Sequence, residues 1–183
     1  EAFRSRLDGY RAERPVGRKY PYRRGDLAAG AHSPIKLVNP PVALMFLEGA
    51  PRLLRAGVHV PLVHRGDVGR GAVEAYPAFA VRRLFASRTR LSYKNDAKAK
   101  QTPAQRALRT EIVRRITAPE TPFGLTLDLT RSQRAALIGD GRGDLLDAVL
   151  CALQAASAWR CCGADYGLPR SLDPLEGWIA TVP

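Results

Sequence analysis

The segment that most constrains this chain is GDLLDAVLCALQAASAW, residues 143–159, which predicts one long and almost entirely apolar helix. Such a helix is normally buried on most sides. Two aspartates nevertheless lie near its beginning. Asp144 and Asp147 are three residues apart, so their side chains share one helical face. No lysine or arginine lies between Asp144 and Trp159 to neutralise them. A buried carboxylate is usually paired, protonated or bound to a metal, so this segment raises the question of a functional site.

Both aspartates also have an ordinary interpretation. Asp144 follows Gly143 and would be a good N-cap, and the helix dipole favours a carboxylate at Asp147. A third acid, Glu74, lies in an apolar run that predicts a strand over residues 72–76. A central strand would bury Glu74, whereas an edge strand would expose it to water. The residues alone leave both alternatives open.

The three acids predict a metal site if they converge. Strand ends beside helix starts are where α/β sheets place their sites, and clustered carboxylates repel one another unless protons or cations intervene. Oxygen ligands suit Mg²⁺ or Mn²⁺, and two such ions can activate a water for phosphodiester hydrolysis. The predicted catalytic and metal-binding residues are Glu74, Asp144 and Asp147, with Mg²⁺ or Mn²⁺ as cofactor.

The charge distribution predicts a polyanionic partner. The net charge is +12, and residues 82–115 carry eleven basic and two acidic side chains, or +9. Such a block favours contact with the phosphates of nucleic acid. The ordinary alternative is a solvated surface that only serves solubility. The residues predicted to bind nucleic acid are Arg82, Arg83, Lys94, Lys98, Lys100, Arg106 and Arg109.

Other segments predict the remaining elements and the setting. Residues 42–54 predict a mostly buried helix that Pro51 kinks or breaks, and residues 65–71 a glycine-rich turn. No apolar run is long enough to cross a membrane. Three cysteines, with Cys161 and Cys162 adjacent, favour a reducing, cytoplasmic setting. Further helices are expected over residues 77–85, 102–116 and 130–137, and strands over residues 58–63, 72–76 and 178–183.

Five stretches, in this order, resemble an uncharacterised family of predicted nucleases with a ribonuclease-H-like fold, over about residues 20–183: LVNPPVALMFLEGAPRLLRAGV, AVEAYPAF, SYK, GDLLDAVLCALQAA and DPLEGWIATVP. The motif at residues 144–148 also resembles the last acidic motif of Holliday-junction resolvases. The resemblance implies that Glu74 is a metal ligand and that Asp144 and Asp147 are the acids of the last helix. It also implies a Tyr93–Lys94 pair of unassigned role.

The resemblance further implies that the N-terminal strands of that fold, and the first metal-binding Asp, are absent here. Asp8 and Asp26 lie in loop-like contexts and are poor substitutes. We therefore expect a single α/β domain over residues 1–183, a ribonuclease-H-like mixed sheet flanked by helices that lacks its N-terminal strands. The expected function is metal-dependent hydrolysis of DNA or RNA. The alternatives are a non-catalytic nucleic-acid-binding module of this fold, and a metabolic enzyme or structural subunit whose carboxylates only cap and pair.

Overall fold

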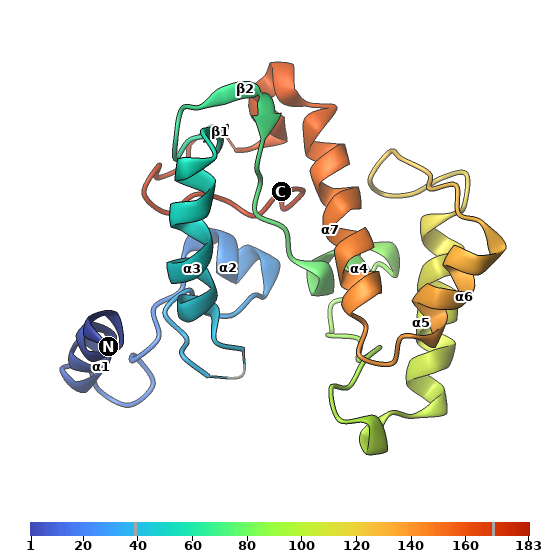
Figure 1. The fold of residues 1–183 in the computed structure, drawn as a ribbon, viewed down its shortest axis with the longest axis horizontal. Coiled ribbons are helices and arrows are strands. Elements are labelled where there is room, and N and C mark those ends of the chain that lie inside the picture. Colours follow the sequence, from blue (N-terminus) through green and yellow to red (C-terminus); the bar gives the residue numbers. More distant parts are fainter. Residues whose placement is uncertain (39, 170) are drawn as a thin grey trace. The chain divides into compact units, whose positions relative to one another are not determined.

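The computed structural model describes residues 1–38, 40–169 and 171–183. Within these residues the protein is α/β and mostly helical, with a small parallel sheet of two strands (Figure 1). The prediction of an α/β chain is confirmed at this level. The chain forms two compact units, residues 1–72 with 169–183, and residues 73–168. We call them the first and second unit. The single domain and its ribonuclease-H-like type stay predictions.

Among its described residues, the first unit contains three helices and the sheet. The Asp26 side chain, which we expected in a loop, lies in a helix and is 1% exposed. Both of its oxygens accept hydrogen bonds from the Arg23 guanidinium, and the Arg23 guanidinium also donates to the Glu176 carbonyl at 3.0 Å. Asp8 also lies in a helix. The elements are α1 (Ala2–Ala12), α2 (Arg24–Ala29), α3 (Val42–Arg55), β1 (Val58–His59) and β2 (Asp67–Gly71).

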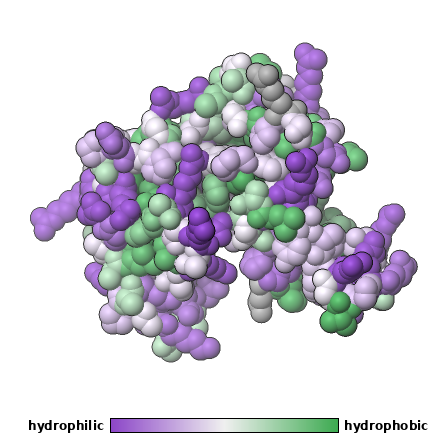
Figure 2. Space-filling model, turned by 180° about the vertical axis from the view of Figure 1, so that it is seen from behind, coloured by the Kyte–Doolittle hydropathy of each residue, from purple (hydrophilic) through white to green (hydrophobic). Residues whose placement is uncertain are grey.

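Helix α3 differs from its prediction. It runs unbroken through Pro51, and only Ala43 in it is buried. The expectation of a mostly buried helix was wrong, because five of its large apolar side chains lie in solvent. Figure 2 shows that apolar side chains reach the surface at several places on the face it draws. The exposed residues of α3 are Met45, Phe46, Leu47, Leu53 and Leu54.

The strands also differ from their predictions. Strand β2 lies within the predicted glycine-rich turn, whereas residues 72–76 contain no strand beyond a single bridge position at Glu74. Strand β1 covers two residues of the predicted run, and residues 178–183 form turns and one bridge position. Glycine explains the position of β2, because a Cβ at Gly66 would collide with the Val58 carbonyl. Only a residue without a side chain allows this close backbone approach.

The second unit is a helical assembly. Helix α4 packs against α5 and α7, and α6 packs against the same two helices (Figure 1). Leu84, Ile112 and Leu150 lie in the shared core, each at most 7% exposed. The elements are α4 (Pro77–Leu84), η1 (Lys98–Lys100), α5 (Pro103–Ile116), α6 (Arg131–Gly139), α7 (Asp144–Trp159) and η2 (Cys162–Gly167).

Helices α4, α5 and α6 confirm their predictions, and capping explains where two of them begin. The Thr102 hydroxyl accepts from the Gln105 N–H, and the Gln105 side chain accepts from the Thr102 N–H. Thr130 and Gln133 form the same reciprocal pair before α6. These capping boxes satisfy N–H groups that have no partner within the helix.

Helix α7 is present as predicted, but it is buried on one face only. Leu146, Leu150 and Leu153 follow helical spacing and are at most 1% exposed. On the other side Leu145 and Trp159 are about half exposed. The expectation of burial on most sides was therefore wrong.

Candidate functional site

The centre of the candidate site is the Asp147 carboxylate, in the first turn of α7. Its Oδ1 accepts a hydrogen bond from the Tyr93 hydroxyl at 2.5 Å, and its Oδ2 accepts one from the Lys94 ammonium at 2.5 Å. The counter-charge that is missing from α7 thus comes from a residue 53 positions earlier in the chain. The Asp147 side chain is 26% exposed, and that of Lys94 is 32% exposed. Solvent and solutes therefore reach this ion pair.

Tyr93 is the rigid member of this group. It is 4% exposed and belongs to the core of the second unit. Burial, followed by the negative charge of Asp147, raises the pKa of the Tyr93 hydroxyl well above its ordinary value. The hydroxyl therefore remains a donor over the physiological pH range. Burial and Asp147 also raise the pKa of the Cys151 thiol, one turn further along α7.

The segment that carries Tyr93 and Lys94 is held on both sides. Arg109 is 3% exposed, and its guanidinium donates to the Tyr93 carbonyl at 2.7 Å and the Ile138 carbonyl at 2.9 Å. The Asn95 N–H donates to the Gly141 carbonyl at 3.1 Å. Arg109 therefore positions this segment from inside the protein, so we leave it out of the proposed phosphate-binding set.

Gly143 leaves the space in which the Lys94 side chain lies. Its backbone is left-handed, with φ of 75°, where glycine is favoured. A Cβ at this position would lie 2.9 Å from Lys94 Cβ and 2.8 Å from Lys94 Cδ. The lysine methylenes therefore lie against the bare backbone of Gly143. This contact directs the ammonium to Asp147.

Asp144 lies outside the Asp147 group. Its side chain is 65% exposed, with an oxygen 3.4 Å from Arg142. The alternative interpretation of Asp144 as the N-cap does not hold, because the helix begins at Asp144 and Gly143 occupies the N-cap. Asp140 does the capping, since its carboxylate accepts from the Leu145 N–H at 2.9 Å. Burial alone would raise the pKa of Asp140, but its backbone N–H donors lower it.

The predicted metal site does not form in this arrangement. Glu74 is exposed and precedes α4. Among residues 1–38, 40–169 and 171–183, no group of three or more His, Cys, Asp and Glu side chains is placed to hold a metal ion. Asp147 already receives a cation, the Lys94 ammonium, and a hydroxyl donor. Glu74, Asp144 and Asp147 as placed here therefore do not fit Mg²⁺ or Mn²⁺, and we derive no chemistry through a metal.

The other predicted phosphate contacts lie at the surface of the second unit. Lys98, Lys100 and Arg106 are exposed, the first two on η1 and the third on α5. On α4 the Arg83 guanidinium lies over the Phe123 ring, and that of Arg82 lies near the Phe79 ring. Arg83 is exposed as well, but its guanidinium lies over a ring, whereas Lys98, Lys100 and Arg106 follow Lys94 in one stretch of the chain. They form, with Lys94, the candidate nucleic-acid interface.

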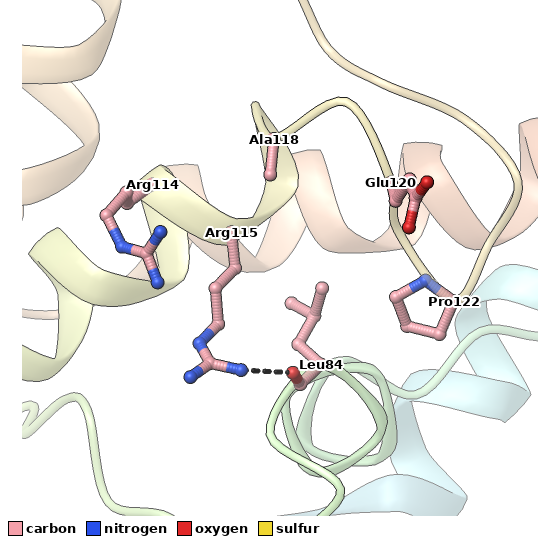
Figure 3. Close-up of a pocket in the computed structure, with 6 residues that line it drawn as sticks. All are labelled: Leu84, Arg114, Arg115, Ala118, Glu120 and Pro122. Carbon is pink, nitrogen blue, oxygen red and sulfur yellow. Dashed lines mark hydrogen bonds between the residues drawn. The ribbon is translucent and has the colours of Figure 1, made fainter.

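A small hollow of about 220 Å³ lies elsewhere in the second unit, and Figure 3 shows its lining. The Arg115 guanidinium at its wall donates to the Leu84 carbonyl at 2.8 Å and to Glu111. Arg114 also pairs with Glu111 through two hydrogen bonds. Both arginines are therefore committed to contacts within the protein. The hollow is lined by Leu84, Arg114, Arg115, Ala118, Glu120 and Pro122.

The fold and this site define an α/β chain with a half-buried Asp–Lys–Tyr group beside a basic surface. The chain belongs to the family described as "Protein of unknown function (DUF429)", whose family model matches residues 37–170. No curated protein and no solved structure matches the chain. Within the described residues, no helix combines the length and apolar character that a membrane span requires. Family membership is thus established, while the nuclease activity and the ribonuclease-H-like fold remain expectations.

Proposed function

We propose that this protein binds the phosphate backbone of nucleic acid through Lys98, Lys100 and Arg106. The observation that supports this function is a pair of exposed lysines on a short turn whose flanks are fixed. The Gln101 side chain, directly after η1, donates to the carbonyl of Asn95, which precedes η1, at 2.9 Å, and the Thr102 capping box then begins α5. Because the backbone of the turn is already fixed, only the lysine side chains are ordered on binding, and two exposed ammonium groups on one turn favour contact with a phosphate strand.

The test is binding of a labelled single-stranded oligonucleotide across a salt series. Removing Lys98 and Lys100 together should weaken binding and reduce the slope of log K against log salt by about 1.4, at about 0.7 per lost phosphate contact. The matched control is Arg18→Ala with Arg55→Ala, which removes two exposed charges from the first unit. Equal losses in the two double variants would refute the proposal, because charge alone would then explain binding.

Phosphodiester hydrolysis by a ribonuclease-H-like domain is the second candidate, and Asp147 is the observation that favours it. Its carboxylate is partly exposed and accepts hydrogen bonds from a lysine and from Tyr93, whose pKa is raised, and groups with perturbed pKa values gather at catalytic sites. The test compares cleavage of single- and double-stranded DNA and RNA by the protein and by Asp147→Ala, with Mg²⁺ or Mn²⁺ added and then omitted. Equal cleavage by both proteins would exclude Asp147 from the reaction. Cleavage that persists with a chelator and without added metal would exclude the expected metal requirement.

A further inference from the structure

We propose that Lys94 is a phosphate ligand that Asp147 holds in the free protein and releases when nucleic acid binds. This inference rests on the proposed nucleic-acid binding and adds one residue and one regulatory contact to it. Lys94 lies four residues before Lys98, at the beginning of the basic turn. In the free protein its charge is neutralised by Asp147 at 2.5 Å. One cation beside the basic surface is therefore paired within the protein and can contact a phosphate only when this ion pair opens.

Asp147 keeps a hydrogen bond when Lys94 leaves. The Tyr93 hydroxyl donates to the other carboxylate oxygen, and Tyr93 is fixed in the core. Asp147 also lies in the first turn of α7, where the helix dipole favours a negative charge. Loss of the ammonium thus leaves a carboxylate that is solvated on one side and hydrogen-bonded on the other. If the carboxylate were deeply buried and lacked the Tyr93 hydrogen bond, losing the Lys94 ammonium would leave an unpaired buried charge, and Lys94 could not move to a phosphate.

Only the end of the Lys94 side chain has to move. The Lys94 carbonyl accepts from the Gln105 side chain at 3.1 Å, and the next residue donates to the Gly141 carbonyl. The lysine stem lies against Gly143, so its first methylenes remain in place. Rotation about the last bonds of a lysine carries the ammonium several ångström without moving the backbone. A phosphate held by Lys98 would offer Lys94 a second anion.

The experiment is a double-mutant cycle in oligonucleotide binding, with Asp147→Asn, Lys94→Met and the two combined. The amide oxygen introduced by Asp147→Asn would still accept from Tyr93, but the uncharged side chain would release the ammonium. We expect Asp147→Asn to tighten binding by up to about fivefold, which is the limit that a partly exposed ion pair sets. We expect the same substitution to leave affinity unchanged in the Lys94→Met background, because no ammonium remains to be released.

Two outcomes would overturn the inference. Equal tightening in both backgrounds would mean that Asp147 only repels the strand, and unchanged or weaker binding by Asp147→Asn would mean that Lys94 never leaves. A second measurement uses the unmodified site: the ¹⁵Nζ signal of Lys94, assigned by its loss in Lys94→Arg, should shift when oligonucleotide is added. An unmoved signal at saturation would also overturn the inference.

The same experiments separate this inference from the function on which it rests. If removal of Lys98 and Lys100 has no larger effect than the control in the first unit, the proposed binding function fails. If that removal weakens binding while the cycle is additive, the binding function holds and the exchange of Lys94 fails. Thermal unfolding of each variant, followed by circular dichroism, confirms that the compared proteins are folded.

Discussion

Replacing Gly143 with alanine should destabilise the second unit, for two reasons that add. The left-handed backbone of Gly143 costs an alanine about 1 to 2 kcal/mol. The new methyl would also lie 2.9 Å from Lys94 Cβ. That atom is next to the backbone and cannot rotate away, so the segment must shift, at about 1 to 3 kcal/mol for overpacking. The sum is about 2 to 5 kcal/mol.

The assay is urea or thermal unfolding followed by circular dichroism. For a chain of this size a loss of 2 kcal/mol lowers the midpoint by about 4 to 8 °C. Gly139→Ala is the matched control, because Gly139 ends α6 with no heavy atom within 4 Å of the added Cβ. The control should change stability by less than about 1 kcal/mol. If Gly143→Ala unfolds with the same midpoint as Gly139→Ala, the account of Gly143 is refuted.

Three further predictions concern single residues of the second unit. Arg109→Met leaves the Tyr93 and Ile138 carbonyls without this donor and should cost about 2 to 4 kcal/mol in urea unfolding, whereas Arg106→Met should cost less than about 0.5 kcal/mol; equal costs would contradict the positioning role. Gln154→Leu removes the acceptor of the Tyr76 N–H at 3.0 Å and should cost about 1 to 3 kcal/mol, and a stability equal to that of the original protein would argue against it. Hydrogen bonds from Arg114 and Arg115 lower the pKa of Glu111 to about 2. Ionised Glu111 therefore contributes stability at pH values above the ordinary pKa of a glutamate, and this contribution is lost as the pH falls toward 2. Between about pH 5 and 2 the protein should lose more stability than Glu111→Gln, and parallel pH profiles would refute this.

Capping chemistry explains why the helices of the second unit could be predicted. Thr102 and Thr130 each precede a glutamine by three residues, and this local pattern specifies where α5 and α6 begin. Pro77 opens α4 for a similar local reason. Signals of this kind need no knowledge of the rest of the chain. The helix starts were therefore predictable from a few neighbouring residues.

Burial could not be predicted from apolar character in the same way. Both α3 and α7 are apolar, yet α3 buries only Ala43 and α7 buries one face. How much of a helix is covered depends on which elements pack against it, and that is a property of the whole chain. Strand β2 was not predicted, because it is a glycine-containing exposed strand without an apolar pattern.

The sequence around Asp140 already indicates a turn that could cap α7. Its position in GDGRGD, four residues before Asp144, combines an acceptor side chain with flanking glycines. An aspartate four residues before Asp144 can reach forward to the first N–H groups of the helix, so the capping side chain need not be next to the helix start. The Asp140 carboxylate caps α7 through the Leu145 N–H, and its bond to the Arg142 N–H lies in the turn before the helix.

Whether Asp147 is expected to bind a metal or an ammonium depends on whether its counter-charge must lie nearby in the sequence. The absence of lysine and arginine from α7 favours a metal only if partners must be close in sequence. Side chains from distant segments meet in a folded core, and Lys94 reaches Asp147 across 53 positions, guided by Gly143. The resemblance singled out the Tyr93–Lys94 pair and Asp147 separately, and the structure joins them by hydrogen bonds. This connection shifts the central question from which metal Asp147 binds to what draws Lys94 away from it.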